Sequence, residues 1–130
     1  MRYLLDTHII LWLAENSPNL SDTAKAVLLD ETNEKYVSVA SCWEVSIKLS
    51  LKKLRLEGGT NEFYRIIREN GFELLQVKAD YLTVLESLPF HHRDPFDRLL
   101  VSTAISDDLT LLTADTQLKT YSSDNLRIIS

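Results

Sequence analysis

The sequence contains very little cysteine, glycine or proline: one, three and three residues respectively in a chain of 130. The single cysteine, Cys42, cannot form an internal disulfide, which is typical of proteins from a reducing compartment. So few glycines and prolines leave no room for low-complexity linkers. We therefore expect one domain, residues 1–130, that is stabilised by a packed core and buries roughly two thirds of its unfolded surface.

Long hydrophobic runs and an excess of positive charge are also missing. No apolar run approaches the ~20 residues that a transmembrane helix requires. Asp6 and His8 interrupt the apolar start, and no small-residue cleavage site follows, unlike a signal peptide. These features predict a cytoplasmic protein with no membrane partner. The net charge of −5 argues against binding nucleic acid by charge attraction alone, but it is compatible with acids that bind a metal cation.

Short apolar segments alternate with helical patterns along the chain. The expected strands cover residues 2–5, 35–40, 72–77, 110–113 and 126–129. The expected helices cover 9–15, 22–31 after the cap Ser21, 41–54 opened by Ser41, 61–70 after the cap Thr60, 79–88 and 95–106. This alternation predicts an α/β fold, a three-layer α/β/α sandwich with a mostly parallel sheet of about five strands. The strand order does not follow from the pattern.

Acidic residues lie where several of these elements meet. Asp6 ends the first strand, and Asp115 follows the fourth in "LLTAD". Glu44 lies early in the helix after the second strand, and Asp94 and Asp97 lie at the start of another helix. Sites in an open parallel sheet form beyond the carboxyl ends of the strands. The five acids are therefore expected to converge if those helices begin at the same edge.

Each acid also has a structural interpretation. Ser41 and Glu44 have the spacing of a capping box, and Glu44 and Lys48 are an i,i+4 ion pair. Asp94, which precedes a proline, is a good N-cap, and Asp97 complements the helix dipole. A turn or cap position explains the two acids that follow strands. For Glu44, and for Asp94 and Asp97 in "RDPFD", a structural role is the simpler explanation when each is taken singly.

Taken together, the acids favour a metal site. Crowded carboxylates raise one another's pKa unless a positive charge lies between them. Mg²⁺ and Mn²⁺ prefer oxygen ligands. Such an ion activates water and stabilises the leaving oxygen in phosphodiester hydrolysis.

Four segments make the sequence resemble the PIN-domain ribonucleases, and among them the VapC-like toxins of type II toxin–antitoxin pairs. They are "LLDTHIILW", "VSVASCWEVSIK", "HHRDPFDRLLVSTA" and "LLTAD", in the order of the family. The resemblance implies a Mg²⁺ site, in which Mn²⁺ can substitute, with four acids as ligands and catalytic residues: Asp6, Glu44, Asp97 and Asp115. It also implies an endoribonuclease that leaves a 5′-phosphate and a 3′-hydroxyl, a cognate antitoxin and a homodimer.

Further residues near these acids are candidates for supporting roles. The hydroxyls of Thr7, Thr113 and Thr116 are placed to orient carboxylates or metal-bound water, although capping or β-propensity explains them equally well. Asp94 is assigned mainly to capping, with support of the metal site as a second role. Arg98 is a candidate phosphate contact.

One helix carries a charged and an apolar stripe. The charged stripe consists of Glu44, Lys48, Lys52 and Arg55, and would either lie along an RNA backbone or form a solvated face. The apolar stripe consists of Trp43, Ile47, Leu51 and Leu54, and would meet the core or a partner chain.

Other chemistries lack their sequence signatures. His8, His91 and His92 do not have the spacing of a closed zinc site and are interpreted as structural or loop residues, with His92 near substrate. No G-x-S-x-G, G-x-G-x-x-G or P-loop motif is present. Two alternatives stay open. One is an α/β phosphatase or phospho-acceptor domain that uses Asp6, although His8 stands where one such class has a second acid; the other is a non-catalytic binding module.

Overall fold

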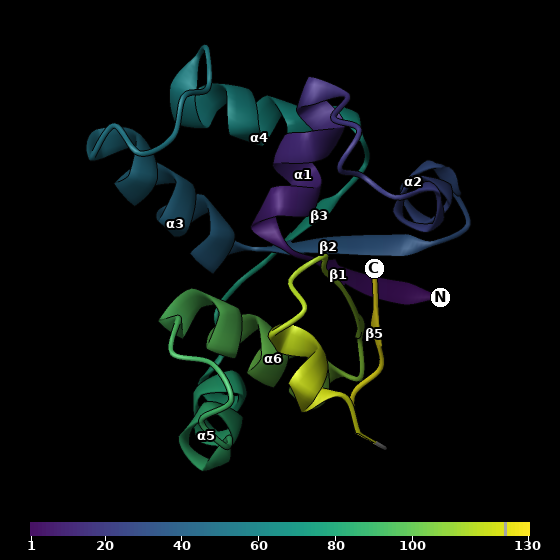
Figure 1. Ribbon diagram of the computed structural model, residues 1–130, viewed down its shortest axis with the longest axis vertical. Coiled ribbons are helices and arrows are strands. Elements are labelled where there is room, and N and C mark those ends of the chain that lie inside the picture. Colours follow the sequence, from purple (N-terminus) through teal and green to yellow (C-terminus); the bar gives the residue numbers. More distant parts are fainter. Residues whose placement is uncertain (124) are drawn as a thin grey trace.

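The computed structural model describes residues 1–123 and 125–130 (Figure 1). Its strands are β1 (Arg2–Leu5), β2 (Glu34–Ser38), β3 (Glu73–Leu75), β4 (Thr110–Leu112) and β5 (Ile128–Ile129). Its helices are α1 (Thr7–Glu15), α2 (Asp22–Leu29), α3 (Val39–Ser50), α4 (Gly59–Glu69), α5 (Ala79–Ser87) and α6 (Pro95–Asp107), with a 3₁₀ helix η1 (Leu118–Tyr121). Within the described ranges, no helix is long and apolar enough to cross a membrane.

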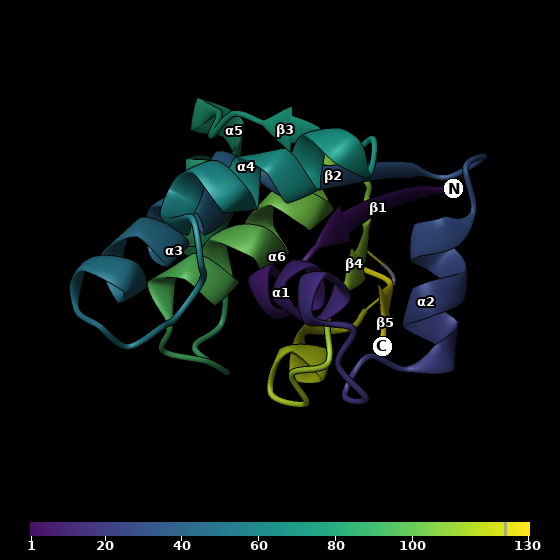
Figure 2. The same ribbon diagram turned by 90° about the horizontal axis from the view of Figure 1, so that it is seen from above.

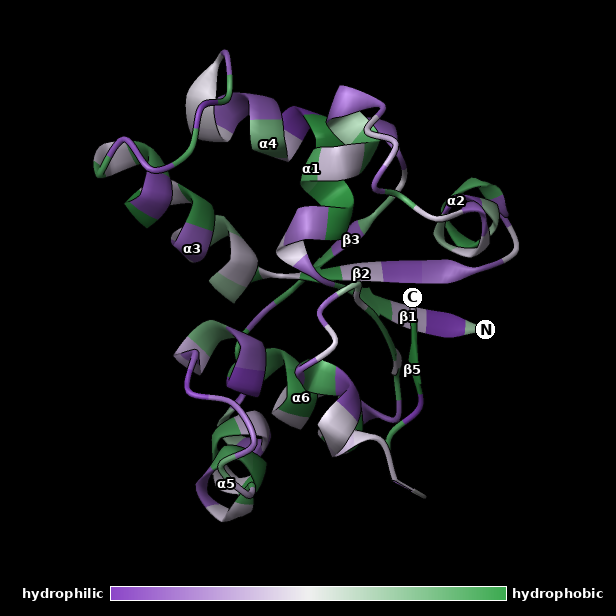
Figure 3. Ribbon diagram, viewed as in Figure 1, coloured by the Kyte–Doolittle hydropathy of each residue, from purple (hydrophilic) through white to green (hydrophobic). Residues whose placement is uncertain are grey.

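The strands form one five-stranded sheet in the order β3-β2-β1-β4-β5, and every neighbouring pair is parallel. The central strand β1 pairs Leu4 with Tyr36 of β2 and with Leu111 of β4. Figure 3 shows that β1 is hydrophilic where it begins and hydrophobic where it ends inside the sheet. Burial on both faces of the sheet explains why β1 and β4 each end in two leucines, at residues 4–5 and 111–112.

Helices cover both faces of this sheet, so the three-layer α/β/α prediction is confirmed (Figures 1 and 2). On one face, Tyr3 and Leu5 pack with apolar residues of α1 to α4. On the other face, Leu4 packs with residues of α6 and η1. The alternation of side chains along β1 therefore divides the core into two halves.

The helix α3 begins and ends earlier than the sequence suggested. Ser38 is its N-cap, with Oγ accepting a hydrogen bond from the N–H of Ala40 at 3.1 Å. Ser41 is therefore inside the helix, and its buried hydroxyl has no hydrogen-bond partner in the described part of the chain. The capping-box interpretation of Ser41 and Glu44 is wrong, because Glu44 lies in the second turn. The helix ends at Ser50, and Lys52 has a left-handed backbone with φ 58°.

The predicted N-cap is wrong for α4 and confirmed for α6. The helix α4 is capped by Gly58, with φ 88°, rather than by Thr60. A Cβ at Gly58 would lie 3.0 Å from the Cβ of Glu62, so glycine suits both the backbone and the space there. The N-cap of α6 is Asp94 as predicted: its Oδ1 accepts hydrogen bonds from the N–H of Phe96 at 2.8 Å and of Asp97 at 3.4 Å.

Candidate metal centre

Asp6 lies at the junction of the two central strands, at their carboxyl ends. Its backbone N–H donates to the carbonyl of Leu112 in β4 at 3.0 Å, which fixes the turn from β1 into α1. The side chain is buried, and its Oδ2 accepts a hydrogen bond of 2.6 Å from the hydroxyl of Thr113. Burial raises the pKa of Asp6, and the charge of Glu44 raises it further, while the bond from Thr113 opposes both.

Glu44 reaches the same edge from α3. It is buried, and both of its carboxylate oxygens have partners: the hydroxyl of Thr7 donates to Oε1 at 2.8 Å, and Nζ of Lys48 donates to Oε2 at 2.9 Å. The predicted i,i+4 pair is therefore present. Burial lowers the pKa of Lys48, but Glu44, Asp94 and Asp97 outweigh this effect, so the pKa is raised and Lys48 stays charged.

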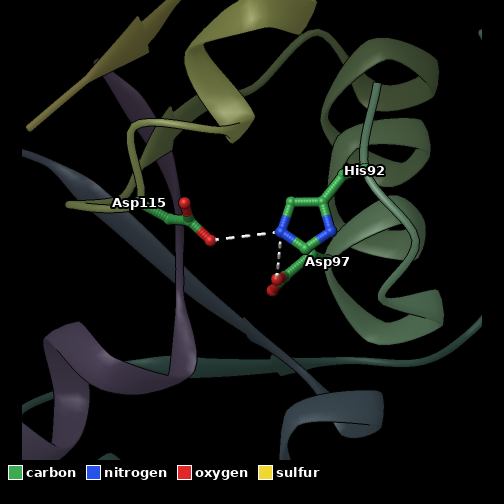
Figure 4. Close-up of side chains that lie close together, drawn as sticks. All are labelled: His92, Asp97 and Asp115. Atoms are coloured by element: carbon green, nitrogen blue, oxygen red, sulfur yellow. Dashed lines mark hydrogen bonds and ion pairs between the residues drawn. The ribbon is translucent and has the colours of Figure 1, made fainter. Parts of the chain in front are cut away.

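Asp97 and Asp115 both approach the same ring nitrogen of His92 (Figure 4). The Nε2 atom of His92 lies 3.3 Å from Oδ2 of Asp97 and 3.3 Å from Oδ2 of Asp115. One ligand atom from each of the three residues lies within 4.8 Å of the other two. The Asp97 side chain, 14% exposed, is more deeply buried than that of Asp115, 35% exposed.

The electrostatics of Asp97 show that the acids are crowded. Burial raises its pKa to about 8, with further contributions, in decreasing order, from Asp6, Asp94, Glu44 and Asp115. All five acids expected from the sequence are thus brought within electrostatic reach of one another. At neutral pH the crowded carboxylates favour a bound proton, or a cation in its place.

The acid cluster borders one cavity, and a second cavity shares two lining residues with the first. One, of about 220 Å³, is lined by Asp6, His8, Trp12, Ala114 and Asp115. The other, of about 210 Å³, lies between α1 and α3 and is also lined by His8 and Trp12, together with Lys48 and Lys53. The cluster is therefore accessible from a surface that carries an aromatic side chain and two lysines.

Three other predicted site residues lie apart from these acids. Arg98 is buried, and its guanidinium donates to the carbonyl oxygens of Pro89 (2.9 Å), Leu85 and Leu88 (3.4 Å each). This contradicts the expectation that Arg98 contacts a substrate phosphate, because its donors hold the preceding loop. Thr116 is exposed after Asp115, and Lys52 is exposed beyond the end of α3.

The expected charged ridge on α3 is therefore wrong beyond Lys48. The helix ends at Ser50, so Lys52 and Arg55 do not continue the row. By contrast, the hydroxyls of Thr7 and Thr113 make the carboxylate contacts that the sequence suggested. The contact of His92 with Asp97 and Asp115 was not predicted from the sequence. The feature that could have indicated it is the position of His92 two residues before Asp94, the N-cap of α6.

The donor set fits a hard divalent cation. Four carboxylates from separate elements lie within electrostatic reach of one another, and carboxylate oxygens are ligands that Mg²⁺ and Mn²⁺ prefer. The hydroxyls of Thr7 and Thr113 hold two of the four carboxylates in place, which is how metal ligands are usually oriented. Asp97 and Asp6, whose pKa values are both raised, are carboxyls that a positive neighbour would stabilise in the charged form.

Several solved structures share this fold, among them members of the VapBC family of toxin–antitoxin systems. VapBC2 from Rickettsia felis, bound to a DNA fragment from its promoter, has 19% identity and a TM-score of 0.74, covering 99% of this chain and 98% of that one. VapBC-1 from nontypeable Haemophilus influenzae has 19% identity and a TM-score of 0.69, covering 99% and 97%. FitAcB from Neisseria gonorrhoeae has 17% identity and a TM-score of 0.66, covering 98% and 96%.

At this level of identity the likeness establishes the fold. None of the curated proteins matches the sequence significantly. The PIN-domain family model matches residues 3–123, which is nearly the whole chain and includes every acid of the cluster. The chain therefore belongs to the PIN-domain family, a family of nucleases.

Proposed function

We propose that the chain is a Mg²⁺- or Mn²⁺-dependent endoribonuclease and the toxin of a toxin–antitoxin pair, acting in the cytoplasm. The metal would be held by Asp6, Glu44, Asp97 and Asp115. The observation that carries this proposal is the convergence of these acids, from four separate segments, around an Asp97 whose pKa is raised to about 8. When bound, the metal supplies an activated water and charge stabilisation for phosphodiester hydrolysis.

The other residues of the site orient the ligands and the substrate. Thr113 and Thr7 hold the carboxylates of Asp6 and Glu44, so that little reorganisation is needed when a cation binds. Lys48, which faces the cavity between α1 and α3, adds a positive charge near the negative cluster. A single-stranded RNA fits this surface, because bases stack on aromatic rings such as that of Trp12.

The partners are proposed from the likeness to toxin–antitoxin structures and from the surface of α3. The structure from Rickettsia felis is a VapBC complex, and another with the same fold is a toxin–antitoxin complex from Klebsiella pneumoniae. On α3 and just beyond it, Trp43 is 64% exposed and Leu51 is 57% exposed. We assign this apolar surface, with Ile47, to contact with a cognate antitoxin or with the second chain of a homodimer.

The alternative that uses Asp6 as a nucleophile explains less of the geometry. Asp6 is buried, and its Oδ2 accepts a hydrogen bond from the hydroxyl of Thr113. A nucleophile requires one carboxylate, whereas a shared metal site gives a role to all four crowded acids. The ribonuclease proposal is therefore the one carried forward, and a non-catalytic module is an outcome of its test.

The test uses purified, antitoxin-free protein and a pool of cellular RNAs. Cleavage is mapped from the cut ends with Mn²⁺, with Mg²⁺ and with a chelator, for the wild type and for Asp97→Asn. Glu86→Gln, a change at an exposed position of α5, is the matched control. We expect discrete cuts that need both the metal and Asp97 and that Glu86→Gln preserves. Full activity in folded Asp97→Asn, or cleavage that persists with the chelator, would refute the proposal.

A folded protein that binds Mn²⁺ but cuts no RNA would instead indicate a metal-binding module. The oligomeric state is measured separately, by light scattering of the antitoxin-free protein. A dimer that becomes a monomer on Trp43→Glu substitution would support the assignment of the α3 surface to the homodimer. A monomeric wild type would leave that surface to the antitoxin.

A further inference from the structure

His92 lies on the loop between α5 and α6, with one ring nitrogen directed at Asp97 and Asp115 (Figure 4). The ring is 12% exposed and has a partner at each nitrogen. The nature of these partners decides which nitrogen carries the proton. That in turn decides whether His92 can bind a metal, accept a proton or only donate a hydrogen bond.

The Nδ1 atom faces a group that can only donate. The backbone N–H of Asp94 lies 3.0 Å from Nδ1 and points at it. An amide N–H has no lone pair to offer, so Nδ1 must be the acceptor and carries no proton. A ring protonated on both nitrogens would set one N–H against another. The hydrogen of the ring is therefore on Nε2.

The Nε2 atom faces groups that can accept. Nε2 lies 3.3 Å from Oδ2 of Asp115, to which its N–H donates, and also 3.3 Å from Oδ2 of Asp97, with which it is in close polar contact. A nitrogen that carries a hydrogen has no lone pair for a metal or for a proton. Metal-bound histidines use their other N–H as a donor, whereas here the other nitrogen already accepts. In this arrangement His92 acts as a hydrogen-bond donor to the cluster, and Nε2 has no lone pair free for a metal or a proton.

Residues of η1 and α6 hold the backbone around His92 in place. The hydroxyl of Tyr121 accepts hydrogen bonds from the N–H of His91 at 3.1 Å and of His92 at 3.2 Å, and donates to the carbonyl of Pro89 at 2.7 Å. The buried Arg98 donates to the same carbonyl at 2.9 Å. The loop is thus held on both sides of the residue that enters the cluster.

Asp94 connects this loop to the helix that carries Asp97. Its N–H fixes the ring of His92, while its side chain caps α6 by accepting from the N–H groups of Phe96 and Asp97. The position of Asp97 and the orientation of the ring are therefore set by one residue.

We propose that His92 is a positioning residue, whose Nε2–H donates to Asp115 while the ring lies against Asp97, and which so sets the spacing of these carboxylates for a metal ion. The role rests on the proposed metal-dependent function. It concerns the arrangement of the ligands and adds no ligand to the metal.

Two variants of His92 separate the functions of its two nitrogens. His92→Gln places an amide donor near the position of Nε2 and removes the acceptor for the N–H of Asp94. His92→Asn keeps an acceptor near Nδ1 and is too short to donate to the two acids. His91→Gln, at the exposed neighbouring histidine, is the matched control. Circular dichroism confirms that each variant is folded.

Three readouts are taken. Nitrogen NMR of the metal-free wild type identifies the tautomer of His92, calorimetry gives the Mn²⁺ affinity, and pulsed EPR detects any imidazole nitrogen bound to Mn²⁺. We expect the Nε2–H tautomer and no bound nitrogen. His92→Asn should weaken Mn²⁺ binding about 10-fold, as loss of a group that orients a ligand does, while His92→Gln and His91→Gln stay within about threefold of the wild type.

The outcomes distinguish this proposal from the metal site itself. An Nδ1–H tautomer, a nitrogen bound to Mn²⁺, or equal affinities of wild type and His92→Asn would overturn the role of His92 while leaving the metal site in place. Equal losses in His92→Gln and His92→Asn would also overturn it, because the donor would not be the feature that matters. A wild type that binds no Mn²⁺ would overturn both.

Discussion

Replacing Asp97 by asparagine should make the metal-free protein more stable, although it removes a proposed metal ligand. In the folded protein the pKa of Asp97 is raised from its ordinary value of 3.8 to about 8, by burial and by the charges of Asp6, Asp94, Glu44 and Asp115. The folded state therefore binds a proton that the unfolded chain does not bind at neutral pH. Between the pKa of the unfolded chain, 3.8, and that of the folded protein, about 8, the wild type loses stability as the pH rises. Asparagine carries no charge, so the variant does not lose stability in this way as the pH rises.

The size of the effect follows from the shift. At pH 7 the unfolded chain lies about three pH units above its own pKa, and each unit corresponds to ~1.36 kcal/mol, which sets an upper limit of about 4 kcal/mol. Asp97 is partly exposed and the cluster opens into a cavity, so solvent screening reduces this limit. We expect a gain of about 2 kcal/mol for Asp97→Asn at pH 7, which raises Tm by about 7 °C for a domain of this size.

The assay is thermal unfolding followed by circular dichroism, with a chelator and at several pH values. The advantage of Asp97→Asn should shrink as the pH falls toward 4, where the carboxyl is protonated in both states of the wild type. Added Mn²⁺ at about 100 times Kd should stabilise the wild type by ~2.7 kcal/mol and Asp97→Asn much less, which reverses the order of the two proteins. The exposed change Glu86→Gln is the control. An Asp97→Asn protein no more stable than the wild type at pH 7, or a difference independent of pH, would refute this reasoning.

Three further predictions concern neighbouring groups. Thr113→Val removes the donor to the buried Asp6 and should lower the free energy of unfolding in urea by about 1–3 kcal/mol. Thr113→Ser keeps the hydroxyl and should leave this free energy unchanged. Equal stability of the wild type and both variants would contradict the contact. Arg98→Met should lower it by about 2–4 kcal/mol, because buried carbonyls lose their donor; unchanged stability with weaker RNA binding would restore Arg98 as a phosphate contact. The Mn²⁺ affinity should rise by up to about tenfold per pH unit from pH 6 to about 8 and then level off, because the metal displaces the proton of Asp97; a pH-independent affinity in calorimetry would count against Asp97 as a ligand.

The convergence of the acids was predictable because parallel strands share their carboxyl edge. Asp6 and Asp115 each follow a strand, and any order that places β1 beside β4 brings them together. The order itself depends on the packing of helices on both faces, which local sequence patterns do not encode. The placement of Asp97 followed from a local rule, since Asp94 and the proline after it define the start of α6.

The errors arose where contacts are distant in sequence. Ser38 and Ser41 are equally good caps locally, and pairing of β2 with both β1 and β3 decides that the strand ends at Ser38. Arg98 looked like a surface cation beside an active site, but its partners include Pro89 and the hydroxyl of Tyr121, 23 residues away. The sequence placed His92 near substrate but did not predict its contact with Asp115, because Asp115 is 23 residues away.

The position of a bound metal tests the proposed function most directly. Crystals grown with Mn²⁺ and measured at a wavelength where manganese scatters anomalously would locate the ion without reference to activity. We expect one or two manganese peaks among the four carboxylates, with bonds of about 2.2 Å from Asp6 and Asp97 and none from His92. A protein saturated with Mn²⁺ whose anomalous peaks all lie elsewhere, or that shows none, would contradict the metal-dependent nuclease.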